Sequence, residues 1–440
     1  MTESPPGPEP SQAPAVEQRE SSHPRDALLT SFGSVTSAVL AGAASILIAR
    51  ELGVDARGDW AAIFALATLV ATLAGLGLPP AAGYAAARVS RRERAGIVEA
   101  ALWASIALGL LAAIAYLVTV RIATPSDASD ALVAAGAGIA LLTVLQNVTQ
   151  QIVLTASSLR WFVAAQVVSA AAAFVAVAVL ALAGELDLWA VVLVFIARAL
   201  FASAISIVAL RRHRVIQRER SVESPRRVVH ILRPYLAYAL LTFGIVSLAT
   251  VVQRVDVLLV EGIRGSRDAG LYAVGIQVID LLLIVPGALG FIAFRGAARS
   301  APDHWRDTLR TLRWVLVLQL VCGALIFAYP ADLLGLVFGD EYEAGAAALR
   351  WLVPAAVLLS LQAVISNYVA GRGRPRSVLI AWGAGAVIGV GVNLAVIPAY
   401  GIEGAAATLS LAYFVILVLH LHAFYAVRPS SGAETDGEGR

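Results

Sequence analysis

The sequence predicts an all-α membrane protein with about twelve transmembrane helices in two six-helix lobes and with both termini in the cytoplasm. Composition is the first reason. Apolar residues make up 59% of the 440 positions and charged residues 14%, whereas soluble domains have about 45–50% and about 25%. The second reason is the length of the apolar stretches, and the third is the alternation of arginine-rich and arginine-poor loops. The short alternating segments of a membrane β-barrel are not found in this sequence.

The apolar stretches define the expected helices in chain order. Each is long enough to cross a hydrocarbon core about 30 Å thick, which needs about 20 residues. A helix also satisfies its own backbone hydrogen bonds, as a segment in lipid must. The predicted helices of the first half are 28–49, 59–86, 96–120, 130–156, 161–184 and 187–210. Those of the second half are 235–260, 269–296, 312–335, 344–369, 376–399 and 401–425.

The distribution of arginine predicts the topology. The chain has no lysine, and its arginines concentrate in the loops after the second, sixth, eighth and tenth stretches, while the intervening loops carry acids such as Asp127 and Glu185. Cytoplasmic loops hold the excess of basic residues, so both termini are expected in the cytoplasm of a multi-pass protein of the plasma (inner) membrane. The pI near 9.2 therefore reflects loops that face anionic lipid and not a nucleic-acid partner.

The same features divide the chain into domains. We expect disordered cytoplasmic tails at 1–27 and 427–440, because both are polar and lack an apolar run. Between them lie an N-terminal lobe at 28–210, an arginine-rich cytoplasmic linker at 211–234 and a C-terminal lobe at 235–426. The single cysteine, Cys322, allows neither an internal disulfide nor a cysteine-based metal cluster, and no metal or other cofactor is expected.

Two short segments, each with a glycine, then an aromatic residue two positions later and an alanine directly after it, open the second and eighth helices. They are Gly58, Trp60 and Ala61 in "ARGDWA" and Gly270, Tyr272 and Ala273 in "DAGLYA", 212 residues further on. An offset of this size with both halves starting on the same side predicts a parallel repeat about an axis along the membrane normal. Chance agreement at three positions is the alternative.

Three longer segments resemble polysaccharide and lipid-linked oligosaccharide flippases. They are 48–88, which contains "IARELGVDARGDWA" and "GLGLPP"; "VQRVDVLLV" followed by "DAGLYAVGIQVIDLLLIVPGALG"; and "GRGRPRSVLIAWGAGAVIGVGVNLAVIPAYGIEGAAATLSLAY". These flippases belong to the multidrug/oligosaccharidyl-lipid/polysaccharide (MATE-like) superfamily, which also contains MATE drug exporters and lipid II flippases. The resemblance extends over residues 28–425, but its motifs are loose and mostly structural.

The resemblance implies a bacterial transporter for cell-surface polysaccharide biosynthesis, lipopolysaccharide included. Its substrate would be an undecaprenyl-diphosphate-linked oligosaccharide or a related precursor, moved across the plasma membrane by alternating access. The implied partners are that lipid, membrane lipids and other proteins of polysaccharide assembly. A sugar diphosphate cannot cross hydrocarbon, so the physical expectation is a water-filled, partly cationic cavity between the lobes.

Charged residues inside the predicted helices are the candidates for that cavity, because a charge at a helix centre costs about 2.5–3.5 kcal/mol on insertion scales. Arg198 in "VFIARALFAS" either meets the diphosphate or pairs with a carbonyl or an acid of a neighbouring helix. Arg254 and Asp256 in "QRVDV" point in different directions on one helix, so one could face the cavity while the other caps or braces the outer turn. We favour Arg254 as the cavity residue and Asp256 as a charge partner or coupling-ion site. Asp280 either neutralises an arginine or binds a coupling cation or proton. Arg350, nearer a helix end, could snorkel to the interface.

Four amide side chains form a second candidate group in the fourth helix. They are Gln146, Asn147, Gln150 and Gln151, which stack in pairs four residues apart. Such amides hydrogen-bond sugar hydroxyls, or they join helix to helix at about 0.6 kcal/mol each. We predict that they form part of the cavity wall.

Two alternative functions remain open at this point. A MATE-type cation-coupled exporter of small molecules would need acids facing a cation, whereas the arginines here at least match the acids within the helices. A membrane enzyme of polysaccharide assembly, a polymerase or ligase, would be expected to have a large outward loop. The sequence also lacks the glycine-rich phosphate loop with its lysine that an ATPase needs. We therefore predict a transporter and not an enzyme.

Overall fold

The structure is a computed structural model, and it describes residues 24–88, 91–123, 129–213, 215, 236–287, 289, 304–372 and 375–428. The predictions of disordered tails at 1–27 and 427–440 and of a polar linker at 211–234 fall wholly or largely outside these residues. The described residues are helical and contain no strand, so the all-α fold class is confirmed.

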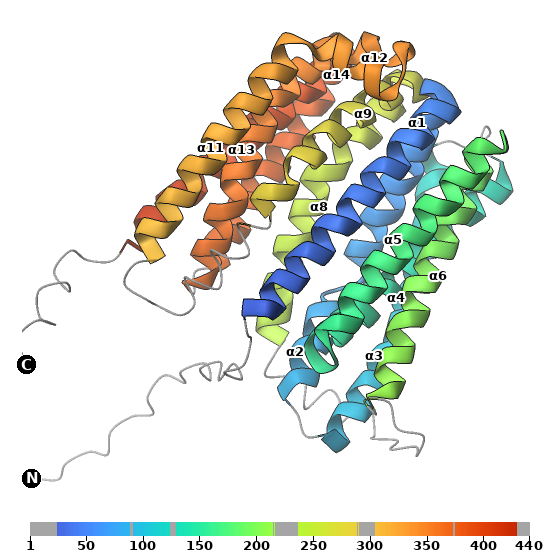
Figure 1. Ribbon diagram of the computed structural model, residues 1–440, viewed down its shortest axis with the longest axis vertical. Helices are drawn as coiled ribbons and strands as arrows, with labels where there is room; N and C mark the ends of the chain where they lie inside the picture. The colour runs from blue at the N-terminus through green and yellow to red at the C-terminus, as the bar shows by residue number, and fades with distance from the viewer. Residues whose placement is uncertain are drawn as a thin grey trace, which may run out of the picture.

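The helices lie roughly parallel to one another (Figure 1). Nine described helices are long and apolar enough to cross a membrane; the total of twelve remains a prediction. The first half contains α1 (Pro24–Ala74), α2 (Leu78–Arg88), α3 (Arg91–Ala123), α4 (Asp130–Ala156), α5 (Leu159–Leu182) and α6 (Leu188–Arg212). The second half contains α8 (Leu236–Arg264), α9 (Ser266–Leu282), α11 (His304–Ala328), α12 (Pro330–Phe338), the 3-10 helix η2 (Asp340–Gly345), α13 (Ala346–Gly371) and α14 (Pro375–Tyr425).

Two of these helices, α1 and α14, are 51 residues long and each contains a sharp break at a glycine. Gly53 in α1 has φ 72° and ψ 175°, and Gly401 in α14 has φ 56° and ψ −139°. A positive φ is accessible to glycine at little cost. The break at Gly53 falls between the helices predicted at 28–49 and 59–86, and the break at Gly401 falls on the first residue of the helix predicted at 401–425. Each pair of predicted helices therefore lies wholly or largely within one long element.

Some predicted helix boundaries were wrong, and glycine and proline account for most of the differences. The helix predicted at 59–86 is interrupted after Ala74 by the turn 75–77, in which Gly77 has φ 75°. The helix predicted at 312–335 ends at Ala328, and Pro330 begins the short helix α12. Proline suits the first turn of a helix because that turn has no partner for its backbone N–H.

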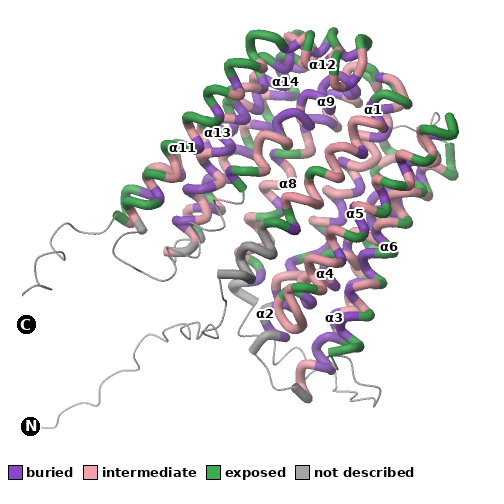
Figure 2. Tube along the Cα trace, viewed as in Figure 1, coloured by how far each residue is buried: buried purple, intermediate pink, exposed green. Residues whose placement is uncertain are grey.

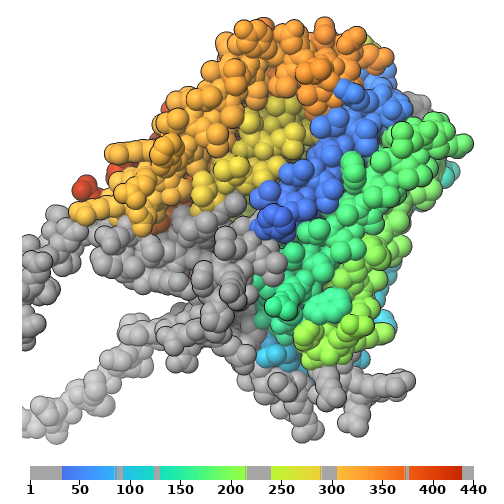
Figure 3. Space-filling view, viewed as in Figure 1, coloured from blue at the N-terminus to red at the C-terminus, as the bar shows by residue number. Residues whose placement is uncertain are grey.

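Helix α1 lies at the centre of the molecule. It packs against α5 of the first half and against α8 and α9 of the second half, and Figure 3 shows it in blue between yellow and green segments. The remaining helices form two groups, with α3, α4, α5 and α6 on one side and α11, α13 and α14 on the other (Figure 1). Residues in the interior of these groups are buried (Figure 2). The contacts of α1 with α8 and α9 show that the two halves meet along these three helices.

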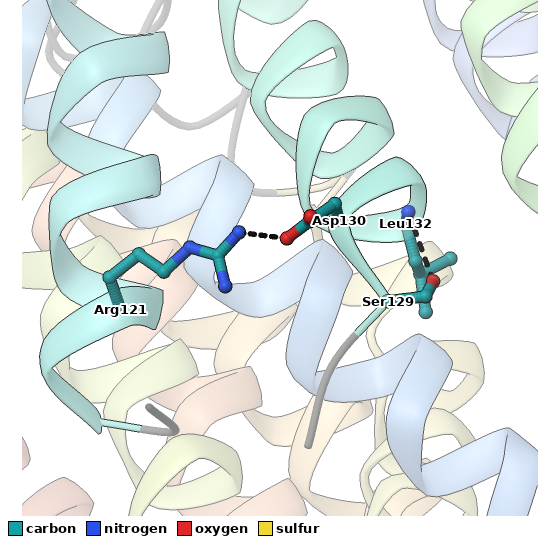
Figure 4. A network of polar contacts seen from close by, with 4 residues as sticks. All are labelled: Arg121, Ser129, Asp130 and Leu132. Carbon is teal, nitrogen blue, oxygen red and sulfur yellow. Dashed lines mark hydrogen bonds and ion pairs between the residues drawn. The ribbon is translucent and has the colours of Figure 1, made fainter. Parts of the chain in front are cut away.

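Polar contacts join the end of α3 to the start of α4 and cap α4 (Figure 4). Arg121 at the end of α3 forms an ion pair with Asp130 at the start of α4. Ser129 caps α4 by accepting a hydrogen bond of 3.3 Å from the backbone N–H of Leu132, which satisfies one of the free N–H groups of the first turn.

The two segments of the predicted repeat contact each other. A Cβ atom on Gly58 would lie 1.8 Å from the carbonyl oxygen of Ser266, and a Cβ atom on Gly270 would lie 2.0 Å from that of Val54. Residues 54 and 58 correspond to residues 266 and 270 at the offset of 212. Reciprocal contacts of this kind are what a two-fold relation produces, so the contacts support a repeat over chance agreement.

Candidate functional site

A cavity of about 320 Å³ lies where the two halves meet. Its wall comes from α1 and from α5, α6, α8 and α9, so helices of both halves contribute. Most of the lining is alanine and other apolar residues, and the charged members are Arg57, Arg198, Arg254 and Asp280. Three guanidinium groups and one carboxyl group give the lining an excess of positive charge.

Arg57 is anchored in this wall by neutral polar groups. Its side chain is buried, and Nη2 donates hydrogen bonds to Oγ of Ser45 at 3.2 Å and to Oε1 of Gln277 at 3.1 Å. Gln277 in turn donates from Nε2 to the carbonyl oxygen of Gly42 at 3.3 Å. The Nε of Arg57 is buried and has no hydrogen-bond partner among the described residues. Its charge is therefore held in place without an ion pair to any carboxylate in the described part of the chain.

Arg198 and Arg254 lie against an aromatic cluster made by Trp60, Phe64 and Phe195. The guanidinium carbon of Arg198 is 5.7 Å from the ring centroid of Phe195, and that of Arg254 is 5.7 Å from that of Phe64. The ring centroids of Trp60 and Phe195 are 4.6 Å apart, and those of Trp60 and Phe64 are 5.5 Å apart. Neither arginine forms an ion pair with a residue that the structure describes. The rings position both cations through cation–π contacts while leaving their N–H groups available.

The two predicted acids lie in different surroundings. Asp280 lines the cavity, and with Arg254 and Tyr413 it also lines an adjoining hollow of about 60 Å³. Asp256 is only 1% exposed and does not line either cavity. It accepts hydrogen bonds from Oη of Tyr272 at 2.7 Å and from the backbone N–H of Val257 at 2.8 Å. Asp256 thus braces α8 against α9, whereas Asp280 faces the space that holds the arginines.

The structure does not bring the amides of α4 to this cavity. Gln146, Asn147, Gln150 and Gln151 are not among its lining residues. Asn147 is exposed, and the other three are half-buried. A Cβ atom on Gly83 would lie 2.9 Å from Cγ of Gln151, so this amide lies between α4 and α2. A role in sugar binding remains a prediction for these four residues.

Sequence reasoning missed Arg57 and its partner Gln277. Arg57 stands beside Gly58 in "ARGDWA", a segment that was interpreted only as part of a repeat. The available signal for Arg57 was its place directly before a glycine of the repeated segment, where two backbones come into contact. For Gln277 no signal distinguished this amide from those of α4.

The end of the interface that carries Gly53 and Gly265 is closed. Oη of Tyr342 donates to the carbonyl oxygen of Ala49 at 2.8 Å, and Nε of Arg50 donates to that of Val337 at 2.8 Å. At the surface of this end, a guanidinium nitrogen of Arg267 is 3.9 Å from a carboxylate oxygen of Asp55. Each of these contacts joins the first half to the second, and together with the Gly58 and Gly270 contacts they close the space above the cavity.

Comparison with known proteins gives a family match. The sequence profile of the family described as "Polysaccharide biosynthesis protein" matches residues 25–295, which is more than half of the chain. A curated relative, an undecaprenyl-diphosphatase of Mycolicibacterium gilvum (strain PYR-GCK), is 27% identical over 125 residues. That match covers 28% of this chain and 39% of the relative, so the chain spans about two fifths of the relative's length.

Solved structures with the same fold are transporters by their descriptions. A structure of the lipid II flippase MurJ in an inward closed conformation has a TM-score of 0.66 and 11% identity, and the match covers 90% of this chain and 87% of that one. An inward-facing multidrug resistance MATE family transporter of the MOP superfamily has a TM-score of 0.63 and 16% identity, covering 91% and 97%. At these identities the likeness establishes the fold, and the cavity lies within the matched fold.

Proposed function

Because this chain belongs to the polysaccharide biosynthesis protein family, we propose that it is a flippase that moves a lipid-linked, anionic glycan precursor across the membrane by alternating access. The substrate we propose is an undecaprenyl-diphosphate-linked oligosaccharide or a related precursor. One observation carries the proposal: Arg57, Arg198 and Arg254 come from three helices of both halves and line one cavity together with a single acid.

The chemistry of these side chains suits a diphosphate. Guanidinium groups donate paired, charge-assisted hydrogen bonds to phosphate oxygens. Arg198 and Arg254 form no ion pair with a carboxylate that the structure describes, so an incoming anion would not have to break one. The aromatic rings of Trp60, Phe64 and Phe195 offer faces on which a sugar ring could pack while the arginines hold the diphosphate.

The packing at the closed end supports a rocking mechanism. The halves touch there through glycine backbones and a few hydrogen bonds, which a rotation of one half against the other would break without unfolding a helix. In the proposed cycle the headgroup enters the cavity while this end is closed. Opening of the Gly58 and Gly270 contact then exposes the headgroup to the other side.

A MATE-type cation-coupled exporter is the second candidate, because MATE transporters share the fold. A pocket for organic cations would gain from acids, and among the described residues Asp280 is the single carboxyl group that lines the cavity. The balance of charge therefore favours an anion. A membrane enzyme of polysaccharide assembly has less support. Acid–base chemistry commonly uses an acid and a base positioned together, whereas the described lining of the cavity has one carboxyl group.

The test is transport in liposomes that contain the purified protein and a fluorescent (NBD-labelled) undecaprenyl-diphosphate-linked sugar, with dithionite as the membrane-impermeant quencher. We expect the wild type to move the label between leaflets. The double variant Arg198→Gln and Arg254→Gln should be slower by about tenfold or more, because each lost charged hydrogen bond contributes about 1.5–3 kcal/mol.

Arg350→Gln is the matched control. Arg350 is an exposed arginine of α13 that donates to the carbonyl oxygen of Phe327 at 3.3 Å and does not line the cavity. It should retain transport within about twofold. Equal rates in the double variant and the wild type would refute the role of the two arginines. Uptake of ethidium with no movement of the lipid would favour the exporter.

A further inference from the structure

A second hollow opens between α5 and α6. It has a volume of about 610 Å³, and its wall consists of three alanines of α5 and six residues of α6. All of these except Arg198 are apolar. Figure 3 shows the two helices in green along one outer edge of the molecule. Leu200 and Phe201 of the wall are 50% and 44% exposed, so the groove opens toward the surface that lipid surrounds.

The groove and the central cavity meet at one point. Arg198 and Ala173 line both of them. The Nε of Arg198 is buried without a hydrogen-bond partner among the described residues. A group bound at Arg198 would therefore reach the cavity on one side and the groove on the other.

We infer that the α5–α6 groove holds the hydrocarbon chain of a polyprenyl diphosphate while its headgroup lies in the central cavity, with Arg198 at the junction between chain and diphosphate. This inference rests on the proposed function and assigns the path of the lipid tail. The wall chemistry supports the assignment: alanines leave room for a narrow apolar chain, and the one charged residue is complementary to the one anionic group of such a lipid.

The position of Arg198 along α6 also supports the assignment of the groove to the lipid tail. The residue lies near the middle of α6, which spans Leu188–Arg212, so its charge is close to the centre of the predicted membrane crossing. A lone arginine at such a depth is costly, and an anion delivered there by a lipid would offset this cost. An ordinary acyl chain would fill the same walls but would bring no charge to Arg198.

The test uses photocrosslinking in liposomes. The probe is a polyprenyl diphosphate with a diazirine in its chain, and the comparison probe has the same chain but ends in a free alcohol. After irradiation, mass spectrometry of peptides locates the label. We expect the diphosphate probe to label α5 and α6 around residues 172–176 and 194–204, at about tenfold the level of the alcohol, and we expect Arg198→Gln to remove the difference.

Two variants fill the groove, one on each helix. If one of them misfolds, the other still tests the inference. Ala176→Trp and Ala204→Trp place a large side chain in the wall and should reduce labelling of the groove by about tenfold. Val179→Trp is the matched control, because Val179 lies on α5, is 59% exposed and does not line the groove. It should be labelled like the wild type. Size-exclusion profiles identify any variant that has misfolded.

The failure of this inference is distinguishable from failure of the proposed function. Labelling at other helices, with the diphosphate lipid still moved in the dithionite assay, would overturn the tail path alone. Equal labelling by the two probes would also overturn it, because it would show a groove for any hydrocarbon. Labelling that survives both tryptophan variants would have the same consequence. Absence of lipid movement by the wild type would refute the proposed function itself.

Discussion

The substitution Gly270→Ala should shift the transporter toward its open conformation, because the added methyl group prevents the two halves from meeting at the closed end. The Cβ atom of Gly270→Ala would lie 2.0 Å from the carbonyl oxygen of Val54 and 3.0 Å from its carbonyl carbon. Contacts below 3.0 Å are essentially never found for real Cβ atoms, and ordinary contact begins near 3.4 Å. The obstacle is backbone on α1, which no rotamer change can move. The two halves must therefore separate at this point by about 1.0–1.4 Å.

The energetic consequence falls on one conformation only. Overpacking of a close contact costs about 1–3 kcal/mol, which converts to a shift of about 5–150-fold in the equilibrium between closed and open forms. Alanine also has a higher helix propensity than glycine by about 1 kcal/mol. Gly270 lies within α9, and this gain applies to both conformations if α9 stays helical. The gain in helix propensity therefore does not restore the closed conformation.

The assay is a distance measurement across the closed end. With Cys322→Ser as the background, spin labels at Asp55→Cys and Arg267→Cys report the separation of the halves. The natural side chains there form a 3.9 Å ion pair and are 69% and 61% exposed, so their loss costs at most about 1 kcal/mol. Gly262→Ala is the control, because a Cβ atom at Gly262 meets nothing within 4 Å. We expect a longer distance for Gly270→Ala only. Identical distance distributions in the two glycine variants would refute the argument.

Three further predictions concern single side chains. Arg57→Gln should slow lipid movement in the dithionite assay by about tenfold or more without loss of the folded protein, because the glutamine cannot supply the buried charge; transport equal to that of Arg350→Gln would contradict it. Tyr272→Phe should lower stability in detergent by about 1–3 kcal/mol, because Asp256 loses the 2.7 Å hydrogen bond from the tyrosine hydroxyl; an unchanged melting temperature would show that this bond is dispensable. Gly53→Ala should cost about 1–3 kcal/mol in the same measurement, because alanine is strained at φ 72° and ψ 175°. Gly389→Ala, at a helical glycine with open space around it, should have no such cost, and equal melting temperatures for the two would argue against the strain.

The sequence by itself determined the fold class and most of the helices. Long apolar stretches specify helices in lipid regardless of their neighbours, and the structure confirms the all-α fold. The glycines at positions 58 and 270 also indicated the repeat in the sequence, because a position where two backbones touch has no room for a side chain. Helix ends were less predictable where a glycine turn or a proline interrupts an apolar run, as at 75–77 and at Pro330.

The composition of the site was decided by tertiary structure. Arg198, Arg254 and Asp280 were predictable as a set because a charge within an apolar helix is conspicuous. Arg57 was not. The α4 amides are not among the lining residues of this cavity, and their role in a cavity wall remains a prediction. The physical reason is that a sequence fixes the angle between residues on one helix but not the rotation of that helix against its neighbours. In a membrane protein both faces of a helix are apolar, so periodicity gives little information about that rotation, and small residues at the contacts set it instead.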